Sequence, residues 1–297
     1  MAQGASDGAR LIGVMADGAP AFDIARSLAR AVDHQDGLRI LPIAGKGPVQ
    51  TLTDLIELRG VDAVIVPSDA AHYAGRNGLI DIDKIAYLAK IASLDVHVIA
   101  GPAVTEISQL AAKRVAVGTT SGYGFVSASL IFEALGIGFE ALPLEGEEAI
   151  RAVAAGAADA AVIVGMKPLL QAIRPDSGLH LLTVPFNEKL AEAYIPSILS
   201  DETFPGLLTK GQIAETVASG LVVAVINWPG RSARSEKIRR FTTALLDAFA
   251  SDDGGEAGLN LAAEVPGWKR YGAAEEWLKG RQSSVQPEGT ATVLTED

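Results

Sequence analysis

Short apolar runs alternate along the chain with segments in which apolar residues recur every three or four positions. The apolar runs are predicted strands, and they lie within residues 9–22, 38–45, 58–69, 94–101, 112–125, 139–146, 154–166 and 178–185. The amphipathic segments are predicted helices over residues 20–33, 49–59, 81–92, 122–135, 147–155 and 168–174. Strands that alternate with helices indicate parallel β-α-β units, with helices on both faces of a sheet. The predicted fold class is therefore α/β.

The strand-bearing segments also form an internal repeat. The first segment of each unit runs from a basic residue through a short apolar strand into a turn-rich loop and a helix start. In chain order the paired segments are 9–22 with 112–125, 38–45 with 139–146, 58–69 with 154–166, and 94–101 with 178–185. A unit that occurs twice predicts two lobes of similar design, each a mostly parallel sheet flanked by helices.

The section after residue 185 does not continue the repeat. Residues 214–230 predict a further helix and strand, and residues 232–251 predict a long amphipathic helix. We expect this section to cross back and complete the first lobe. The predicted bounds are 1–102 with 218–297 for the first lobe, 103–217 for the second, and hinge crossings near 101–112 and 216–228. The polar residues 281–297 are predicted to form a mobile tail.

Composition narrows the range of partners and compartments. The formal net charge is −11 and no run of lysine or arginine occurs, so we expect neither nucleic acid nor acidic lipid as a partner. The chain has no cysteine, which excludes thiol catalysis and disulfides. Its apolar runs are far shorter than a membrane span, so we expect no membrane insertion. The first residues lack the pattern of a signal peptide, which fits a cytoplasmic protein or a mature secreted one without its leader.

The loops that follow the strands are the candidate site. In parallel α/β sheets, ligands bind beyond the carboxyl ends of the strands. In the first unit these loops read MADGAPAF, AGKGPV and VPSDAAHY, and in the second GTTSGYGF, LEGEE and VGMKPLL. If the two lobes face each other, all six loops line one cleft.

The loop over residues 118–125 is the most informative. Ser121 has Thr119 two positions before it, where a nucleophile elbow needs glycine, and no lysine follows as in a phosphate P-loop. Gly122 and Gly124 match only half of a dinucleotide fingerprint. What remains is a helix start with unpaired N–H groups and the hydroxyls of Thr119, Thr120 and Ser121, which favour a carboxylate or a similar anion. The alternative is that Ser121 only caps the helix.

The other candidate residues each have a structural alternative. Asp17 either holds a ligand ammonium or hydroxyl group or makes a turn, and Phe22 forms an apolar wall or belongs to the core. Lys46 and Lys167 lie at the predicted cleft edge or are solvated lysines. The remaining candidates for ligand contact are Ser68, Tyr123 and Met166, of which Tyr123 and Met166 would pack on the apolar part of the ligand.

Catalytic and metal-binding patterns are missing from the sequence. The four histidines show neither HxxxH nor HExxH spacing, so we expect no metal site. No set of serine, lysine and carboxylate indicates hydrolysis, and we expect neither a cofactor nor an enzyme.

The chain resembles the TAXI solute-binding proteins (TRAP-associated extracytoplasmic immunogenic proteins) over residues 10–275. Residues 45–74 resemble the family's Gly-Ser-Val-x-Asn…Gly-x-x-Asp segment, residues 113–137 its Gly-Ser-Gly-Thr loop and helix, and residues 265–271 its Pro-Gly-x-x-x-Tyr segment. The first loop keeps one aromatic residue where the family has two tyrosines. The Gly-Ser-Gly-Thr positions are Ser121, Gly122, Tyr123 and Gly124 here, so the particular ligand does not carry over.

The resemblance implies a two-lobed fold like that of type II periplasmic binding proteins, with a ligand cleft between the lobes. It also implies a monomeric periplasmic receptor that binds a small organic acid or amino acid and delivers it to the membrane permease subunits of a TRAP transporter. Two alternatives remain open. One is an enzyme on the same scaffold that acts on a small organic acid, and the other is the effector-sensing module of a regulator.

Overall fold

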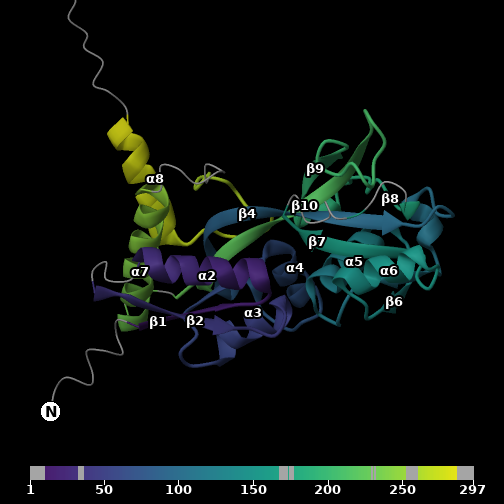
Figure 1. Ribbon diagram of the computed structural model, residues 1–297. Helices are drawn as coiled ribbons and strands as arrows, with labels where there is room; N and C mark the ends of the chain where they lie inside the picture. The colour runs from purple at the N-terminus through teal and green to yellow at the C-terminus, as the bar shows by residue number, and fades with distance from the viewer. Residues whose placement is uncertain are drawn as a thin grey trace, which may run out of the picture.

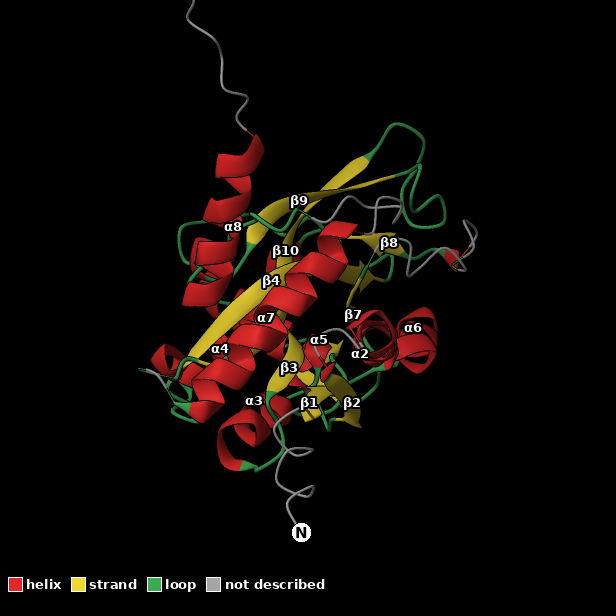
Figure 2. Ribbon diagram, turned by 90° about the vertical axis from the view of Figure 1, so that its left-hand side faces the viewer, coloured by secondary structure: helices red, strands yellow, loops and turns green. Residues whose placement is uncertain are grey.

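The computed structural model describes residues 11–32, 37–166, 173, 177–228, 230, 232–251 and 260–285. Its strands form one ten-stranded mixed sheet in the order β2-β1-β3-β10-β4-β7-β5-β6, with β8 paired to β4 and β9 paired to β10. The sheet is curled and helices pack along it (Figure 1 and Figure 2). The α/β class predicted from the alternating pattern is confirmed.

The first lobe contains three parallel strands and the helices that follow them. The strands are β1 (Leu11–Ala16), β2 (Arg39–Ala44) and β3 (Ala63–Pro67), and the helices are α2 (Ala19–Val32), α3 (Pro48–Glu57) and α4 (Ser68–Arg76). β1 lies between β2 and β3 and pairs with both in parallel. Every residue of β1 after Leu11 is buried, because helices cover both faces of a parallel sheet.

The second lobe repeats this arrangement. Its strands are β5 (Arg114–Ala116), β6 (Glu140–Leu142) and β7 (Ala160–Gly165), and its helices are α5 (Tyr123–Leu135) and α6 (Gly146–Ala154). β5 lies between β6 and β7 and pairs with both in parallel, as β1 does in the first lobe. The internal repeat of the sequence is therefore present in the order and direction of the strands.

Two long strands connect the lobes. β4 (Ile85–Ala100) and β10 (Ile213–Ile226) pair antiparallel over residues 85–95 and 218–226, while β4 continues along β7 and β10 runs along β3. We expected a separate sheet in each lobe, but this ladder joins both into one. β8 (His180–Leu181) pairs with β4, and β9 (Ile195–Ser200) pairs with β10, both antiparallel. The lobe bounds at residues 102 and 217 stay a prediction.

Two predicted helices are wrong. Residues 85–92 of the helix expected over 81–92 belong to β4, and residues 214–220 belong to β10. Residues 85–92 are almost continuously apolar, and residues 214–220 are almost all buried although they include Glu215, Thr216 and Ser219, so neither stretch has a period that separates a buried strand from a buried helix. The helix between β3 and β4 is α4 instead, which starts inside a stretch interpreted as a loop. Of the helix expected over 168–174, only residue 173 is described.

The carboxyl-terminal section packs on the first lobe. It contains α7 (Ala233–Ser251) and α8 (Gly272–Val285). Ile238, Phe241 and Leu245 of α7 lie in one core cluster with residues of β1 and α2. Residues 281–285 are the last turn of α8 rather than part of a tail, and residues 286–297 lie outside the described residues.

A close backbone approach fixes β1 beside the loop before β3. The carboxylate of Asp62 accepts a hydrogen bond from the N–H of Gly13 at 3.0 Å and one from Nζ of Lys237 on α7 at 2.7 Å. A Cβ atom on Gly13 would overlap the carbonyl oxygen of Gly60. Only glycine fits at residue 13 without moving one of the two segments.

We therefore predict that Gly13→Ala destabilises the protein by about 1–3 kcal/mol, because a backbone carbonyl cannot turn aside as a flexible side chain does. Chemical denaturation monitored by circular dichroism measures the change. Gly138→Ala is the control, since a Cβ there meets nothing within 4 Å. Equal stability of the two variants would contradict the close approach.

Candidate functional site

A pocket of about 910 Å³ lies between the two lobes, at the carboxyl ends of the parallel strands. From the first lobe it is lined by residues after β1 and β2, including Asp17, Gly18, Lys46 and Gly47. The second lobe contributes the loops after β5, β6 and β7. Leu94 of β4 and Leu221 of β10 lie between the two sets, on the strands that connect the lobes.

Three helix N-termini that meet at the pocket lack a side-chain cap. Gly47 precedes α3, Gly122 precedes α5 and Glu145 precedes α6, and none of these N-cap residues accepts a hydrogen bond on its side chain. The first N–H groups of a helix have no partner within the helix, and they carry its partial positive charge. N-termini from both lobes therefore offer backbone donors to an anion in the pocket.

The loop before α5 is shaped by its backbone. Ser121 has φ 68°, in the left-handed region that favours glycine, and the cap position belongs to Gly122. The interpretation of Ser121 as the helix cap is therefore wrong. Its carbonyl oxygen lies 3.4 Å from the position that a Cβ on Gly47 would take. Gly47 has φ 89°, so its backbone conformation favours glycine there, whereas the space beside Ser121 would accept a Cβ atom.

Most of the sequence-predicted site residues line the pocket. They are Asp17, Lys46, Thr119, Thr120, Gly122, Tyr123 and Met166. Ser121, Phe22 and Ser68 are not among its lining residues. Phe22 packs against the core of the first lobe, and Ser68 is buried, where its hydroxyl accepts a hydrogen bond from the N–H of Gly220 at 2.9 Å. Lys167 lies outside the described residues.

Sequence reasoning missed several lining residues. Glu145 projects beside Gly118, with Oε2 3.1 Å from the position of a Cβ on that glycine. Residues 162–164 of β7 add an apolar surface to the same pocket. The loop of Glu145 was expected to line the cleft. This loop contains Glu145, Glu147 and Glu148, and nothing in the sequence distinguishes Glu145 as the one that faces the pocket.

Tyr123 joins the two lobes across the pocket. Its hydroxyl donates a hydrogen bond to the carbonyl oxygen of Asp17 at 2.8 Å. Burial raises the pKa of Tyr123, and the negative charges of Asp17 and Asp69 raise it further. The phenol therefore stays protonated in neutral solution and keeps the proton that it donates across the pocket.

A buried polar cluster lies between α4 and α5. Oδ2 of Asp69 on α4 accepts hydrogen bonds from the hydroxyl of Ser127 on α5 at 2.6 Å and from that of Tyr194 at 2.8 Å. All three side chains are buried. Burial raises the pKa of Asp69, against the opposing effect of the two hydrogen bonds. A desolvated carboxyl group thus connects a helix of the first lobe to one of the second.

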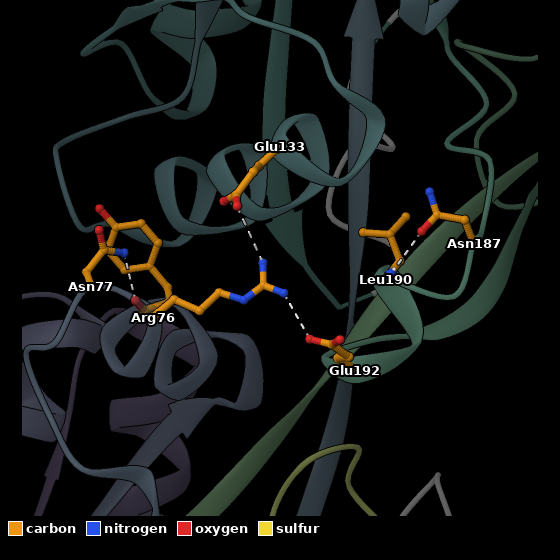
Figure 3. A network of polar contacts seen from close by, with 7 residues as sticks. Arg76, Asn77, Glu133, Asn187, Leu190 and Glu192 are labelled. Carbon is orange, nitrogen blue, oxygen red and sulfur yellow. Dashed lines mark hydrogen bonds and ion pairs between the residues drawn. The ribbon is translucent and has the colours of Figure 1, made fainter.

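The exposed end of the same interface carries ion pairs. Arg76 at the end of α4 lies between Glu133 of α5, at 3.8 Å, and Glu192 of the 3₁₀ turn Leu190–Glu192, at 2.9 Å (Figure 3). Each pair is solvent-exposed and contributes only about 0–1 kcal/mol. The exposed pairs thus fix the direction of α4 less firmly than the buried cluster does.

In the described part of the chain, no group of three or more His, Cys, Asp and Glu side chains could hold a metal ion. Of the described helices, none is long and apolar enough to cross a bilayer.

No protein-family model and no curated protein sequence matches the chain. Solved structures resemble it in fold. The periplasmic binding protein BugD shares 15% sequence identity and a TM-score of 0.52, over 92% of this chain and 94% of BugD. MatC from Rhodopseudomonas palustris with bound malate shares 14% identity and a TM-score of 0.50, over 82% and 86%. The chain therefore has the two-lobed fold of periplasmic binding proteins.

We predict that the stability of the protein depends on the ionisation of Asp69. Because its pKa is raised in the folded state, the folded protein favours the protonated carboxyl. The contribution of Asp69 is therefore largest below the ordinary value of 3.8 and is lost as pH rises through the folded-state pKa. Asparagine does not ionise. Between about pH 3.5 and 8, the free energy of unfolding of Asp69→Asn should therefore rise relative to that of the wild type as the pH is raised.

Urea denaturation of both proteins at several pH values measures this difference. Glu188→Gln, at an exposed position, is the matched control and should show no such trend. A difference between Asp69→Asn and wild type that is independent of pH would contradict the raised pKa.

Proposed function

We propose that the protein is an extracytoplasmic solute-binding receptor of the TAXI type, which captures a small organic acid or amino acid between its lobes. It works in the periplasm and delivers its ligand to the permease subunits of a TRAP transporter. The observation that carries the proposal is the pocket of about 910 Å³ into which helix N-termini from both lobes point.

The pocket has the groups that such a ligand needs. Backbone N–H groups at the start of α5 and the hydroxyls of Thr119 and Thr120 suit a carboxylate, with Lys46 as a cationic side chain on the opposite lobe. These groups bind charge and donate hydrogen bonds, but they do not form the pair of a nucleophile and a base that covalent catalysis requires. This arrangement favours a receptor over an enzyme.

The neighbours in fold support the same role. BugD is named as a periplasmic binding protein, and the structure of MatC contains malate, a small organic acid. At 14–15% sequence identity, the similarity to these two proteins concerns the fold alone. We therefore infer the class of ligand from the chemistry of this pocket.

Closure of the lobes provides the signal to the transporter. The strands β4 and β10 pass from one lobe to the other, so a bend in them moves the loops of the two lobes toward or away from each other. The contact of Tyr123 with Asp17 belongs to the closed arrangement. A ligand that touches both lobes favours closure, and the closed surface is the one that a permease recognises.

We predict that organic acids or amino acids raise the thermal unfolding midpoint of the purified protein. A ligand at 100 times its dissociation constant adds about 2.7 kcal/mol of stability. Differential scanning fluorimetry with a panel of both classes measures the shift, and the fluorescence of Trp228, Trp268 and Trp277 during titration checks it. The absence of a response to every member of the panel would overturn the proposal.

The Thr119→Val variant tests the location of the site. It removes a hydroxyl that lines the pocket and should weaken binding of the responding ligand about two- to tenfold. Thr209→Val, an exposed position away from the pocket, is the control and should bind as wild type does.

We predict that Tyr123→Phe shifts the unliganded protein toward an open arrangement. The variant keeps the ring but loses the hydrogen bond to Asp17, which contributes about 1 kcal/mol and therefore about a fivefold change in the ratio of closed to open molecules. Small-angle X-ray scattering should give a larger radius of gyration for the variant. Tyr73→Phe, whose ring packs on Phe125, is the control. An identical radius in both would contradict the role of Tyr123.

A further inference from the structure

The pocket is large and apolar between its polar loops. Its volume of about 910 Å³ lies at the upper end of the range of about 300–1,000 Å³ for small-molecule sites. Leu94, Val164 and Leu221, from the three strands β4, β7 and β10, line it where the lobes join. Polar groups that could pair with a second charge on a ligand are therefore missing from this side of the described pocket. Hydrocarbon on a ligand would be buried there, which is favourable.

The charged side chains at the pocket oppose a second carboxylate. Asp17 comes from the first lobe and Glu145 from the second, and both line the pocket together with Lys46. A ligand between the lobes thus faces a negative side chain from either side. One carboxylate fits at the helix N-termini, where backbone donors are available. The starts of α3 and α5 are neighbours, so this carboxylate also takes up Lys46, the one cationic side chain among the described lining residues. A further carboxylate would then lie beside Asp17 or Glu145 or on apolar residues, and these placements are costly.

We propose that the ligand is a monocarboxylate with an apolar body, such as a branched-chain or aromatic 2-oxo acid or amino acid, rather than a dicarboxylate. This inference rests on the proposed function and names its substrate class. The carboxylate binds at the start of α5, the body lies on the apolar residues of β4, β7 and β10, and Glu145 rejects ligands that carry a second negative charge.

Two pairs of probes test the inference. 4-Methyl-2-oxopentanoate and 2-oxoglutarate share the same 2-oxo acid head and differ at the far end, where one has methyl groups and the other a carboxylate. Leucine and glutamate form the same pair with an ammonium group. Isothermal titration calorimetry should give at least tenfold tighter binding of the apolar member in at least one pair, equivalent to about 1.4 kcal/mol.

The outcomes separate this inference from the proposed function. If the dicarboxylate binds as tightly as its apolar partner or more tightly, the inference is wrong and the carboxylate receptor stands. If none of the four probes binds, the proposed carboxylate receptor fails, and the inference fails with it.

Glu145→Gln tests the charged side of the pocket. It should tighten binding of 2-oxoglutarate about threefold or more, which is the size of a Coulomb interaction between partly solvated charges, and leave 4-methyl-2-oxopentanoate within about twofold. Glu148→Gln is the matched control, because Glu148 is exposed in the first turn of α6, three residues after Glu145, and does not line the pocket. Equal effects of the two substitutions on 2-oxoglutarate would overturn the role of Glu145.

Val164→Thr tests the apolar side. Replacing a methyl group by a hydroxyl should weaken 4-methyl-2-oxopentanoate about threefold or more without weakening 2-oxoglutarate. An unchanged thermal midpoint shows that the variant is folded. Equal weakening of both ligands would contradict contact between Val164 and the apolar body.

Discussion

The backbone hydrogen bonds between β4 and β10 hold the two lobes together, and the pocket depends on them. Both strands run from one lobe into the other, and their pairing continues from Ile85 to Asp95 on one strand and from Ala218 to Ile226 on the other. Unpaired backbone groups in a buried strand are costly, so the strands must bend together. The register shifts between Leu221 and Val222 and again between Val223 and Ala224. Such irregularities bend a strand locally, and Leu221 also lines the pocket, so the ladder is most easily bent beside the ligand.

The two sides of the pocket resist motion differently. Behind it, Asp69 of α4 is joined to Ser127 of α5 and to Tyr194 beyond it, and the carboxyl group would lose the hydrogen bond from Ser127 if the two helices separated. Breaking such a buried cluster costs far more than breaking a single contact, because the carboxyl would have no replacement partners. In the pocket itself, the hydroxyl of Tyr123 makes one hydrogen bond to a backbone carbonyl, and water in the pocket can replace it. The structure thus favours a motion that keeps α4 on α5 and separates the loops of Tyr123 and Asp17.

Much of the fold could be predicted from the sequence because the repeat is carried by short, local patterns. The strand-loop-helix starts at β1 and β5 share a basic residue, an apolar run and a glycine turn, and these specify a parallel strand without reference to the rest of the chain. β4 and β10 could not be predicted in this way. Their residues are buried on both faces, so the apolar pattern loses its period, and the pairing between them joins residues more than a hundred positions apart. The joining of both lobes into one sheet is therefore a property of tertiary packing alone.

The candidate site shows the same division. Asp17, Lys46 and the loop at Thr119 and Thr120 could be predicted, because the position of a loop after a parallel strand determines the edge of the sheet at which it lies. Ser121 shows the limit of this reasoning. Its place in the loop suggested a cap or a ligand contact, yet its positive φ directs the chain so that Gly122 starts the helix and Ser121 approaches Gly47 of the other lobe. Glu145 and Val164 are the residues that decide between ligands in our proposal. They could not be predicted, because the sequence does not show which side of a helix start or of a strand end faces the pocket. The chemical character of the pocket therefore follows from how the lobes meet, while its position follows from each lobe alone.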